Sequence, residues 1–88
     1  MPRKVRAAKA STYVRVARSL ATKMPGGLFS SAQVAYLAHR RSHRASEFQF
    51  AAEDALRASG QFMPRYQNAG HFSDILLFTL ADGVSHEL

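Results

Sequence analysis

The first clear pattern along the chain is helical and begins at Ser11. Apolar side chains recur at the three- and four-residue spacing of a single helix face, at Tyr13, Val16, Ala17, Leu20, Ala21 and Met24. Arg15, Arg18 and Lys23 fall on the opposite face. Pro25 and the two glycines after it cannot continue a helix. We therefore expect a helix over about residues 11–23, with Ser11 as its N-cap.

The segment from Leu28 to Val34 carries the strongest local signal for the start of a helix. Ser30 and Gln33 have the spacing of a capping box, and Phe29 and Val34 stand at the two positions of a hydrophobic staple. These signals predict a second helix over about residues 31–40, burying Val34, Leu37 and Ala38. Residues 27–29 can add a short strand before it.

A third helix is expected over about residues 46–59, after a polar, basic connection at residues 39–44. Gly60 is well placed to end this helix. Its buried stripe is predicted at Phe48, Ala51, Ala52, Ala55, Leu56 and Ala58. Its outward positions are predicted at Gln49, Phe50, Glu53 and Arg57.

Short extended segments follow the third helix. Strand-forming residues at 61–67 and 74–80 are separated by the turn residues Asn68-Ala69-Gly70, and Ala81-Asp82-Gly83 closes the pair. The chain is thus expected to hold a basic arm at 1–10, one α+β domain of three helices and a C-terminal β-hairpin at 11–83, and a tail at 84–88. The predicted core is Tyr13, Val16, Leu20, Phe29, Val34, Leu37, Phe48, Leu56, Phe62, Leu77 and Leu80.

This order of elements resembles that of winged helix-turn-helix domains, in which the hairpin is the wing. Three segments carry the resemblance. Residues 28–35 (LFSSAQVA) resemble the opening of the family's second helix, residues 55–62 (ALRASGQF) its third helix turning into the wing, and residues 76–80 (LLFTL) the returning wing strand. The resemblance implies a DNA-binding protein whose third helix enters the major groove, with transcriptional control as its purpose.

The distribution of charge points to a polyanion as ligand. The net charge is +6, and residues 1–44 contain ten Lys or Arg and no acid, whereas residues 45–88 contain two Arg and six acids. A basic half of this kind is typical of contacts to phosphates. The alternative is that the basic residues only keep a small protein soluble. Double-stranded DNA is the favoured ligand, and RNA is not excluded.

Mapped onto this chain, the resemblance implies two sets of contact residues. The base-facing set is Arg44, Ser46, Gln49 and Phe50. The phosphate-binding set is Arg40 and Arg41 at the end of the second helix, Arg65 and His71 on the wing, and Arg3, Lys4 and Arg6 in the arm. Arg40 and Arg41 have a second interpretation as cations that favour a helix C-terminus, and Arg44 as a solvated side chain.

The third helix also departs from the pattern of a groove-reading helix. Glu47, Glu53 and Asp54 lie on it with only Arg57 to offset them, and Phe50 lies in the middle of its polar side. Phe50 either packs on the arm or the wing, or is an exposed anchor for a protein partner. The alternative function is therefore a protein-interaction module, or a subunit or inhibitor of a nucleic-acid machine, that uses this helix as a protein-facing surface.

Several other classes of function find little support. The chain has no cysteine and no glycine-rich phosphate loop, and its four histidines (His39, His43, His71, His86) lack a third metal ligand nearby. We expect no enzyme, no cofactor and no metal, and histidines at the solvated surface. The apolar run Ile75–Phe78 is far shorter than the roughly 20 residues of a membrane span. A cytoplasmic homodimer, nucleoid-associated if it binds DNA, is expected, although the acid-free residues 1–23 also resemble a mitochondrial transit peptide.

Overall fold

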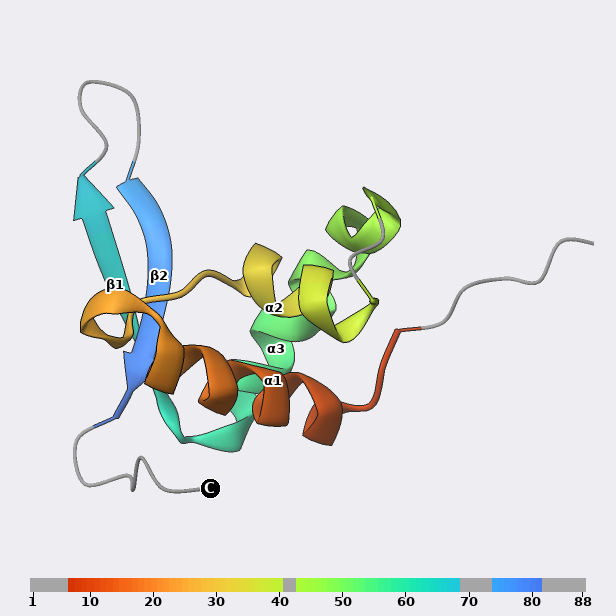
Figure 1. Cartoon of the computed structure of the whole chain (residues 1–88), viewed down its shortest axis with the longest axis horizontal. Coiled ribbons are helices and arrows are strands. Elements are labelled where there is room, and N and C mark those ends of the chain that lie inside the picture. Colours follow the sequence, from red (N-terminus) through yellow and green to blue (C-terminus); the bar gives the residue numbers. More distant parts are fainter. Residues whose placement is uncertain (1–6, 41–42, 69–73, 82–88) are drawn as a thin grey trace, which may run out of the picture.

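The computed structural model describes residues 7–40, 43–68 and 74–81, which fold into helices followed by a β-hairpin (Figure 1). This confirms the expected α+β class. The elements are α1 (Ala10–Lys23), the 3-10 turn η1 (Pro25–Gly27), α2 (Ser31–Ala38), the 3-10 turn η2 (His43–Phe48), α3 (Gln49–Ser59), β1 (Phe62–Asn68) and β2 (Asp74–Leu80). Most of the predicted arm and the whole predicted tail lie outside the described residues. Within the described part, no helix is long and apolar enough to cross a bilayer.

Helix α1 buries the face that its periodicity predicts. Tyr13, Ala17, Leu20 and Ala21 are buried, and Val16 and Met24 pack partly against them. The expected N-cap at Ser11 is wrong, because the helix begins at Ala10 and its N-cap is Lys9, whose side chain makes no capping hydrogen bond. Ser11 already lies in the first turn and is exposed.

The chain leaves α1 through a glycine turn that brings Phe29 to the hairpin. Gly26 and Gly27 have φ angles of 68° and 71°, a left-handed conformation that costs little only for glycine. Phe29 then makes an isolated antiparallel bridge with Phe78 of β2. The predicted short strand at residues 27–29 is thus reduced to one paired residue.

Helix α2 begins as its sequence predicts and ends earlier. The Gln33 amide donates to the Ser30 hydroxyl (3.2 Å) and the Ser30 amide donates to Gln33 Oε1 (2.7 Å), so the capping box is present. Phe29 and Val34, the staple pair, are both fully buried. The helix ends at Ala38 and not at residue 40, because Arg40 adopts a left-handed conformation with φ 60°.

The third helix begins three residues later than expected, because its first part is the tighter turn η2. Ala45 in this turn is buried, which ties η2 to the core. Gly60, with φ 71°, ends α3 as predicted. Ala52, Ala55 and Leu56 form the buried stripe, with Phe48 and Ala51 partly buried beside it. Ala58, which was expected in this stripe, is exposed.

The hairpin pairs Phe62 with Leu80 and Pro64 with Phe78. Because side chains alternate along a strand, Phe78 and Leu80 share one face and Leu77 lies on the other. Phe78 and Leu80 are buried, whereas Leu77 is only half-buried, so the expected core position at Leu77 is wrong. Phe78 directs its own amide and carbonyl away from β1 toward Phe29, and Pro64, which has no amide hydrogen, therefore interrupts no hydrogen bond with Phe78.

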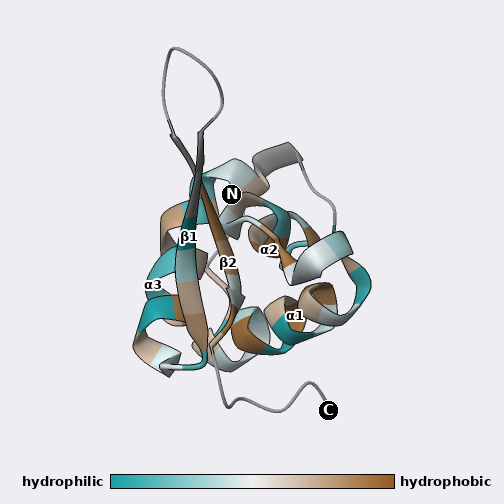
Figure 2. Cartoon of the chain, turned by 90° about the vertical axis from the view of Figure 1, so that its left-hand side faces the viewer, coloured by the Kyte–Doolittle hydropathy of each residue, from teal (hydrophilic) through white to brown (hydrophobic). Residues whose placement is uncertain are grey.

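The core joins the inner face of the hairpin to the three helices (Figure 2). At its centre Phe29 contacts two other rings, Phe62 edge-on at 5.7 Å and Phe78 nearly parallel at 6.3 Å between centroids. Of the predicted core, Tyr13, Leu20, Phe29, Val34, Leu56, Phe62 and Leu80 are buried. Val16, Leu37 and Phe48 lie partly buried at its edge.

Tyr13 links the N-terminal segment to the end of α2 through its hydroxyl. The backbone N–H of Ala8 donates to the Tyr13 oxygen (3.0 Å), and the same oxygen lies 2.7 Å from Nε2 of His39. Since the amide can only donate, the phenol proton is available for His39. The His39 ring also stacks on Phe48, with centroids 4.1 Å apart. One buried hydroxyl therefore joins three segments of the chain.

Removing this hydroxyl is expected to destabilise the fold. Tyr13→Phe leaves the Ala8 amide and His39 Nε2 without their partner and should lower the free energy of unfolding by about 1–2 kcal/mol. The control is Tyr36→Phe, which removes the same atom from an exposed side chain of α2 and should cost less than about 0.5 kcal/mol. Urea unfolding followed by circular dichroism measures both. Equal effects of the two substitutions would contradict the assigned bridge.

Candidate nucleic-acid interface

The predicted base-facing residues lie along η2 and the first turn of α3, which pack beside α2. Ser46 and Phe50 are exposed, and Gln49 is half-buried. Arg44 lies within η2, and its side chain is outside the described part of the structure. Ser46 in η2 and Phe50 in α3 are thus both accessible to a ligand.

Phe50 is the most exposed large apolar side chain in the described part of the chain. It is 73% exposed, compared with 45% for Tyr36 and 39% for Met63. The side chain is therefore not buried against the described part of the hairpin, and most of the arm, the other predicted packing partner, lies outside the described residues. A phenylalanine this exposed is unfavourable in water, and its ring is accessible to a ligand.

The acids on α3 and η2 share this surface. Glu47 and Asp54 are exposed, and Glu53 lies 3.7 Å from Arg57 in an i, i+4 ion pair. The guanidinium carbon of Arg57 also lies 5.9 Å from the centre of the Phe78 ring, beneath the helix. Arg57 is thus held by Glu53 and the hairpin. Its charge offsets Glu53 and leaves the negative charge of Asp54 next to Phe50.

Two residues of the predicted phosphate-binding set are fully described, and both are exposed. Arg40 follows the end of α2, and Arg65 lies on the outer face of β1, where its Nε donates to the Thr79 hydroxyl (3.3 Å). Arg3, Lys4, Arg6, Arg41 and His71 lie outside the described residues. Of this predicted set, the structure therefore places Arg40 after the end of α2 and Arg65 on the hairpin. The other five predicted contacts stay predictions.

Arg40 has a left-handed backbone conformation that is unusual for a residue with a side chain. Its N–H donates to the carbonyl of Leu37 (3.2 Å), a capping role that any residue can fill. Its φ of 60° favours glycine, and Gly60 occupies the corresponding position after α3. An arginine here costs about 1–2 kcal/mol in backbone strain relative to glycine. The position is thus costly for the fold and places a cation in solvent.

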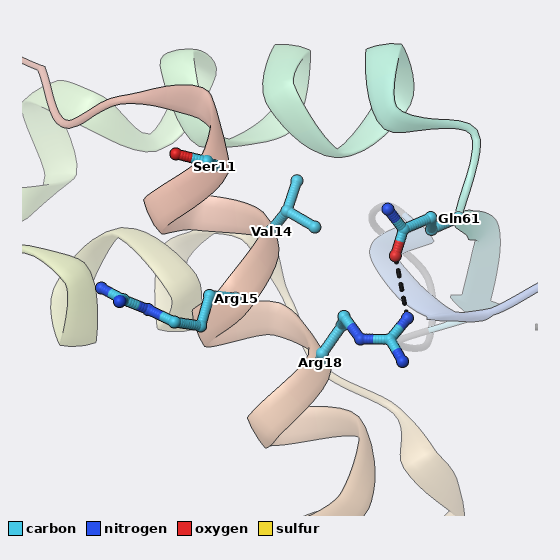
Figure 3. Close-up of a pocket in the computed structure, with 5 residues that line it drawn as sticks. All are labelled: Ser11, Val14, Arg15, Arg18 and Gln61. Atoms are coloured by element: carbon cyan, nitrogen blue, oxygen red, sulfur yellow. Dashed lines mark hydrogen bonds between the residues drawn. The ribbon is translucent and has the colours of Figure 1, made fainter. Parts of the chain in front are cut away.

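A second group of cations, on α1, was not among the predicted contacts. Lys9, Arg15 and Lys23 are exposed, and α1 contains no acid. Arg18 is partly buried, and its NH1 donates to Gln61 Oε1 at 2.8 Å (Figure 3). The sequence shows that Arg15 and Arg18 lie in a segment without acids. It does not show that Gln61, 43 residues after Arg18, approaches them.

An open hollow of about 520 Å³ lies along this face of α1, lined by Ser11, Val14, Arg15, Arg18 and Gln61. Residues 11, 14, 15 and 18 line one side because they are three and four apart on the helix. Gln61 lines the other, because Gly60 turns the chain from α3 back toward α1. The hollow is formed between elements at the surface and is separate from the start of α3.

The histidine that the structure describes most fully differs from its expected place. His39 packs between Tyr13 and Phe48 and is half-buried, so it is a structural residue and not a solvated one. In the part of the chain that the structure describes, no three His, Asp or Glu side chains gather as a metal site would require.

Function has to be inferred from this chain's own side chains, since no family model, curated protein or solved structure matches it.

Proposed function

We propose that the chain is a winged helix-turn-helix domain that binds duplex DNA and controls transcription. The observation that carries the proposal is the pairing of Phe29 with Phe78, on the edge of β2 that faces away from β1. This pairing anchors the residue before α2 to the hairpin, and α3 packs on β1, so that the two strands project beside the helices, with η2 on the far side of the helices (Figure 1). That is the arrangement in which one helix can enter a groove while the wing reaches the backbone.

The charge distribution supports this ligand. All charged side chains among the described residues up to Arg40 are positive, and Arg65 adds a positive charge on the wing. Such contacts act on phosphates whatever the sequence and supply most of the affinity. The negative charge of Asp54, which is exposed, opposes close approach of α3 to phosphates. We therefore expect strong backbone binding with a short base-reading surface limited to Ser46, Gln49 and Phe50.

Two further properties belong to the proposal. One such module covers little DNA, so two copies on a two-fold site would give the required surface, and we propose a homodimer. A DNA-binding protein without cysteine also fits a cytoplasmic, nucleoid-associated location.

Selection of random duplex DNA on the purified protein tests the proposal first. We expect an enriched motif and an affinity that falls with salt at a slope of about −0.9 per phosphate contact on a log–log plot, so that four contacts give about −3.6. The salt titration is made by fluorescence anisotropy on the selected duplex and on a scrambled one. Absence of binding to either duplex at low salt would contradict the proposal.

Arg40→Gly is expected to separate binding from stability. Relief of about 1–2 kcal/mol of strain is offset by about 0.4–1 kcal/mol of added unfolded-state entropy, so the free energy of unfolding should rise by about 0.5–1 kcal/mol. The lost cation should reduce the salt slope by about 0.9 and weaken DNA binding. The control is Gly60→Ala, which has open space for its methyl group at φ 71° and should change stability in the opposite direction. Unchanged DNA affinity in Arg40→Gly would remove Arg40 from the interface.

A second candidate function rests on Phe50 and Asp54. An aromatic side chain that is 73% exposed beside an unbalanced carboxylate is typical of a protein-facing surface with a basic partner. The chain would then be an interaction module, or a subunit or inhibitor of a nucleic-acid machine, whose basic half contacts nucleic acid while α3 contacts protein.

Phe50→Ala distinguishes the two candidates. If α3 reads DNA, the substitution should flatten the preference for the selected motif and leave binding to scrambled DNA and its salt slope unchanged. If α3 faces a protein, motif preference and DNA affinity should both stay unchanged. Met63→Ala, another exposed apolar position, is the matched control for loss of surface area. Both are measured in the anisotropy assay described above, and both variants should remain folded because the removed atoms face solvent.

A further inference from the structure

The solvent side of α1 carries a row of polar side chains, Arg15, Ser19 and Lys23. Successive members are four residues apart, so they are neighbours along one side of the helix. Arg15 and Lys23 are exposed, and Ser19 between them is half-buried. At a rise of about 1.5 Å per residue, the two cations lie about 12 Å apart along the helix axis. We call these three residues the α1 row.

The α1 row faces away from the surface at the start of α3. Helices α1 and α3 pack on one another, and each turns its buried side inward, with Leu20 in α1 and Leu56 in α3. Figure 2 shows α3 on one side of the hairpin and α1 on the other, and in Figure 1 α1 passes in front of α3. The solvent sides of the two helices therefore point away from each other. A duplex held at α3 leaves the α1 row accessible.

The two sides also differ in charge. Helix α1 contains no Asp or Glu, and within the part of the chain that the structure describes neither Arg15 nor Lys23 takes part in an ion pair. The solvent side of α3 carries the exposed carboxylate of Asp54 and the ion pair of Glu53 with Arg57. The potential at the α1 row is therefore positive and attracts an anionic partner more strongly than α3 does.

The composition of the row favours phosphates over a membrane or a protein. Helices that bind a membrane surface expose apolar side chains beside their cations, and protein interfaces are centred on aromatic or apolar anchors. The large apolar side chains that are exposed in the described part of the chain all lie outside α1, at Tyr36, Phe50 and Met63. Arginine, lysine and serine are instead the side chains that contact the phosphates of nucleic acids.

The spacing of the row suits a DNA backbone. Each strand of a duplex carries a phosphate about every 3.4 Å along the duplex axis. The long side chains of Arg15 and Lys23, two helical turns apart, can therefore reach separate phosphates of one duplex. The Ser19 hydroxyl lies between them and can donate to a phosphate oxygen.

We infer that the α1 row binds the phosphate backbone of a second DNA duplex while the surface at the start of α3 holds the first. The contact on α1 is independent of DNA sequence, because phosphates are the same at every base pair. One domain then links two duplexes. The inference rests on the proposed function for the first duplex, whereas the contact on α1 depends only on the row itself.

The test captures a second duplex on beads. A biotinylated duplex with the selected motif is immobilised and loaded with the full chain, and a fluorescent duplex of scrambled sequence is added. The quantity measured is the fluorescent DNA retained per protein retained. We expect the double substitution Arg15→Gln and Lys23→Gln to lower this ratio about tenfold and to reduce the salt slope of capture by about 1.8, because two phosphate contacts are lost. Glutamine favours helices about as well as lysine, so the circular dichroism of the helices should not change.

The matched control is the double substitution Lys9→Gln and Arg65→Gln. It removes the same charge from two exposed positions outside the row and should change the ratio less than about twofold, since salt screens distant charges. An equal loss in the two double variants would overturn the inference, because net charge alone would then explain capture. Undiminished capture by the Arg15 and Lys23 variant would also overturn it and would assign the second duplex to another surface, such as α3 of a second copy.

Two other outcomes separate this inference from the proposed function. If the wild type holds the motif duplex and captures no second duplex, the inference fails and DNA binding at α3 stands. If the wild type shows no preference for any motif, but binds scrambled duplex through Arg15 and Lys23, the contact on α1 stands, whereas base reading by α3 and the linking of two duplexes are both overturned.

Discussion

Phe29 and Phe78 exchange backbone hydrogen bonds in both directions, at 3.1 and 2.7 Å, while their rings lie nearly parallel in a core that excludes water from both. The pairing holds the residue before α2 against the strand that closes the hairpin. Without it, the hairpin would touch the helices through side chains alone, and two strands by themselves are marginally stable. The position of the wing relative to α2 and α3, and hence any binding surface shared by them, depends on this contact.

The features that could be predicted from the sequence are those that neighbouring residues determine. The capping box of Ser30 and Gln33, the left-handed stop at Gly60 and the bounds of β2 each involve side chains or backbone within a few positions. Tertiary packing decided the others. Ala45 is drawn into the core and tightens the start of the third helix into η2. His39 reaches Tyr13, which is 26 residues away, and is therefore half-buried where a solvated side chain was expected.

The candidate sites divide in the same way. The helical wheel placed Phe50 on the polar side of its helix but left open whether it packs on the arm or the wing, and the structure shows it 73% exposed. The hollow on α1 could not be predicted, because half of it is made by Gln61, whose approach depends on how α3 ends. Leu77 and Phe78 are both apolar, so hydrophobicity alone does not show which of them faces the core. A shift of one residue in the strand pattern exchanges the two, and the structure buries Phe78.

A domain of this size fills its interior with the side chains that hold it together, so its chemistry has to lie where elements meet at the surface. Arg40 and Gly60 illustrate the consequence. Both end a helix in the same left-handed conformation, and both donate their backbone N–H to a carbonyl of the last turn. At Gly60 the chain uses the residue that minimises strain, and the result is the close approach of Gln61 to Arg18. At Arg40 a residue with a side chain takes the same strained conformation, and its charge lies in solvent after the C-terminus of α2, where it can favour the helix dipole or contact an anion.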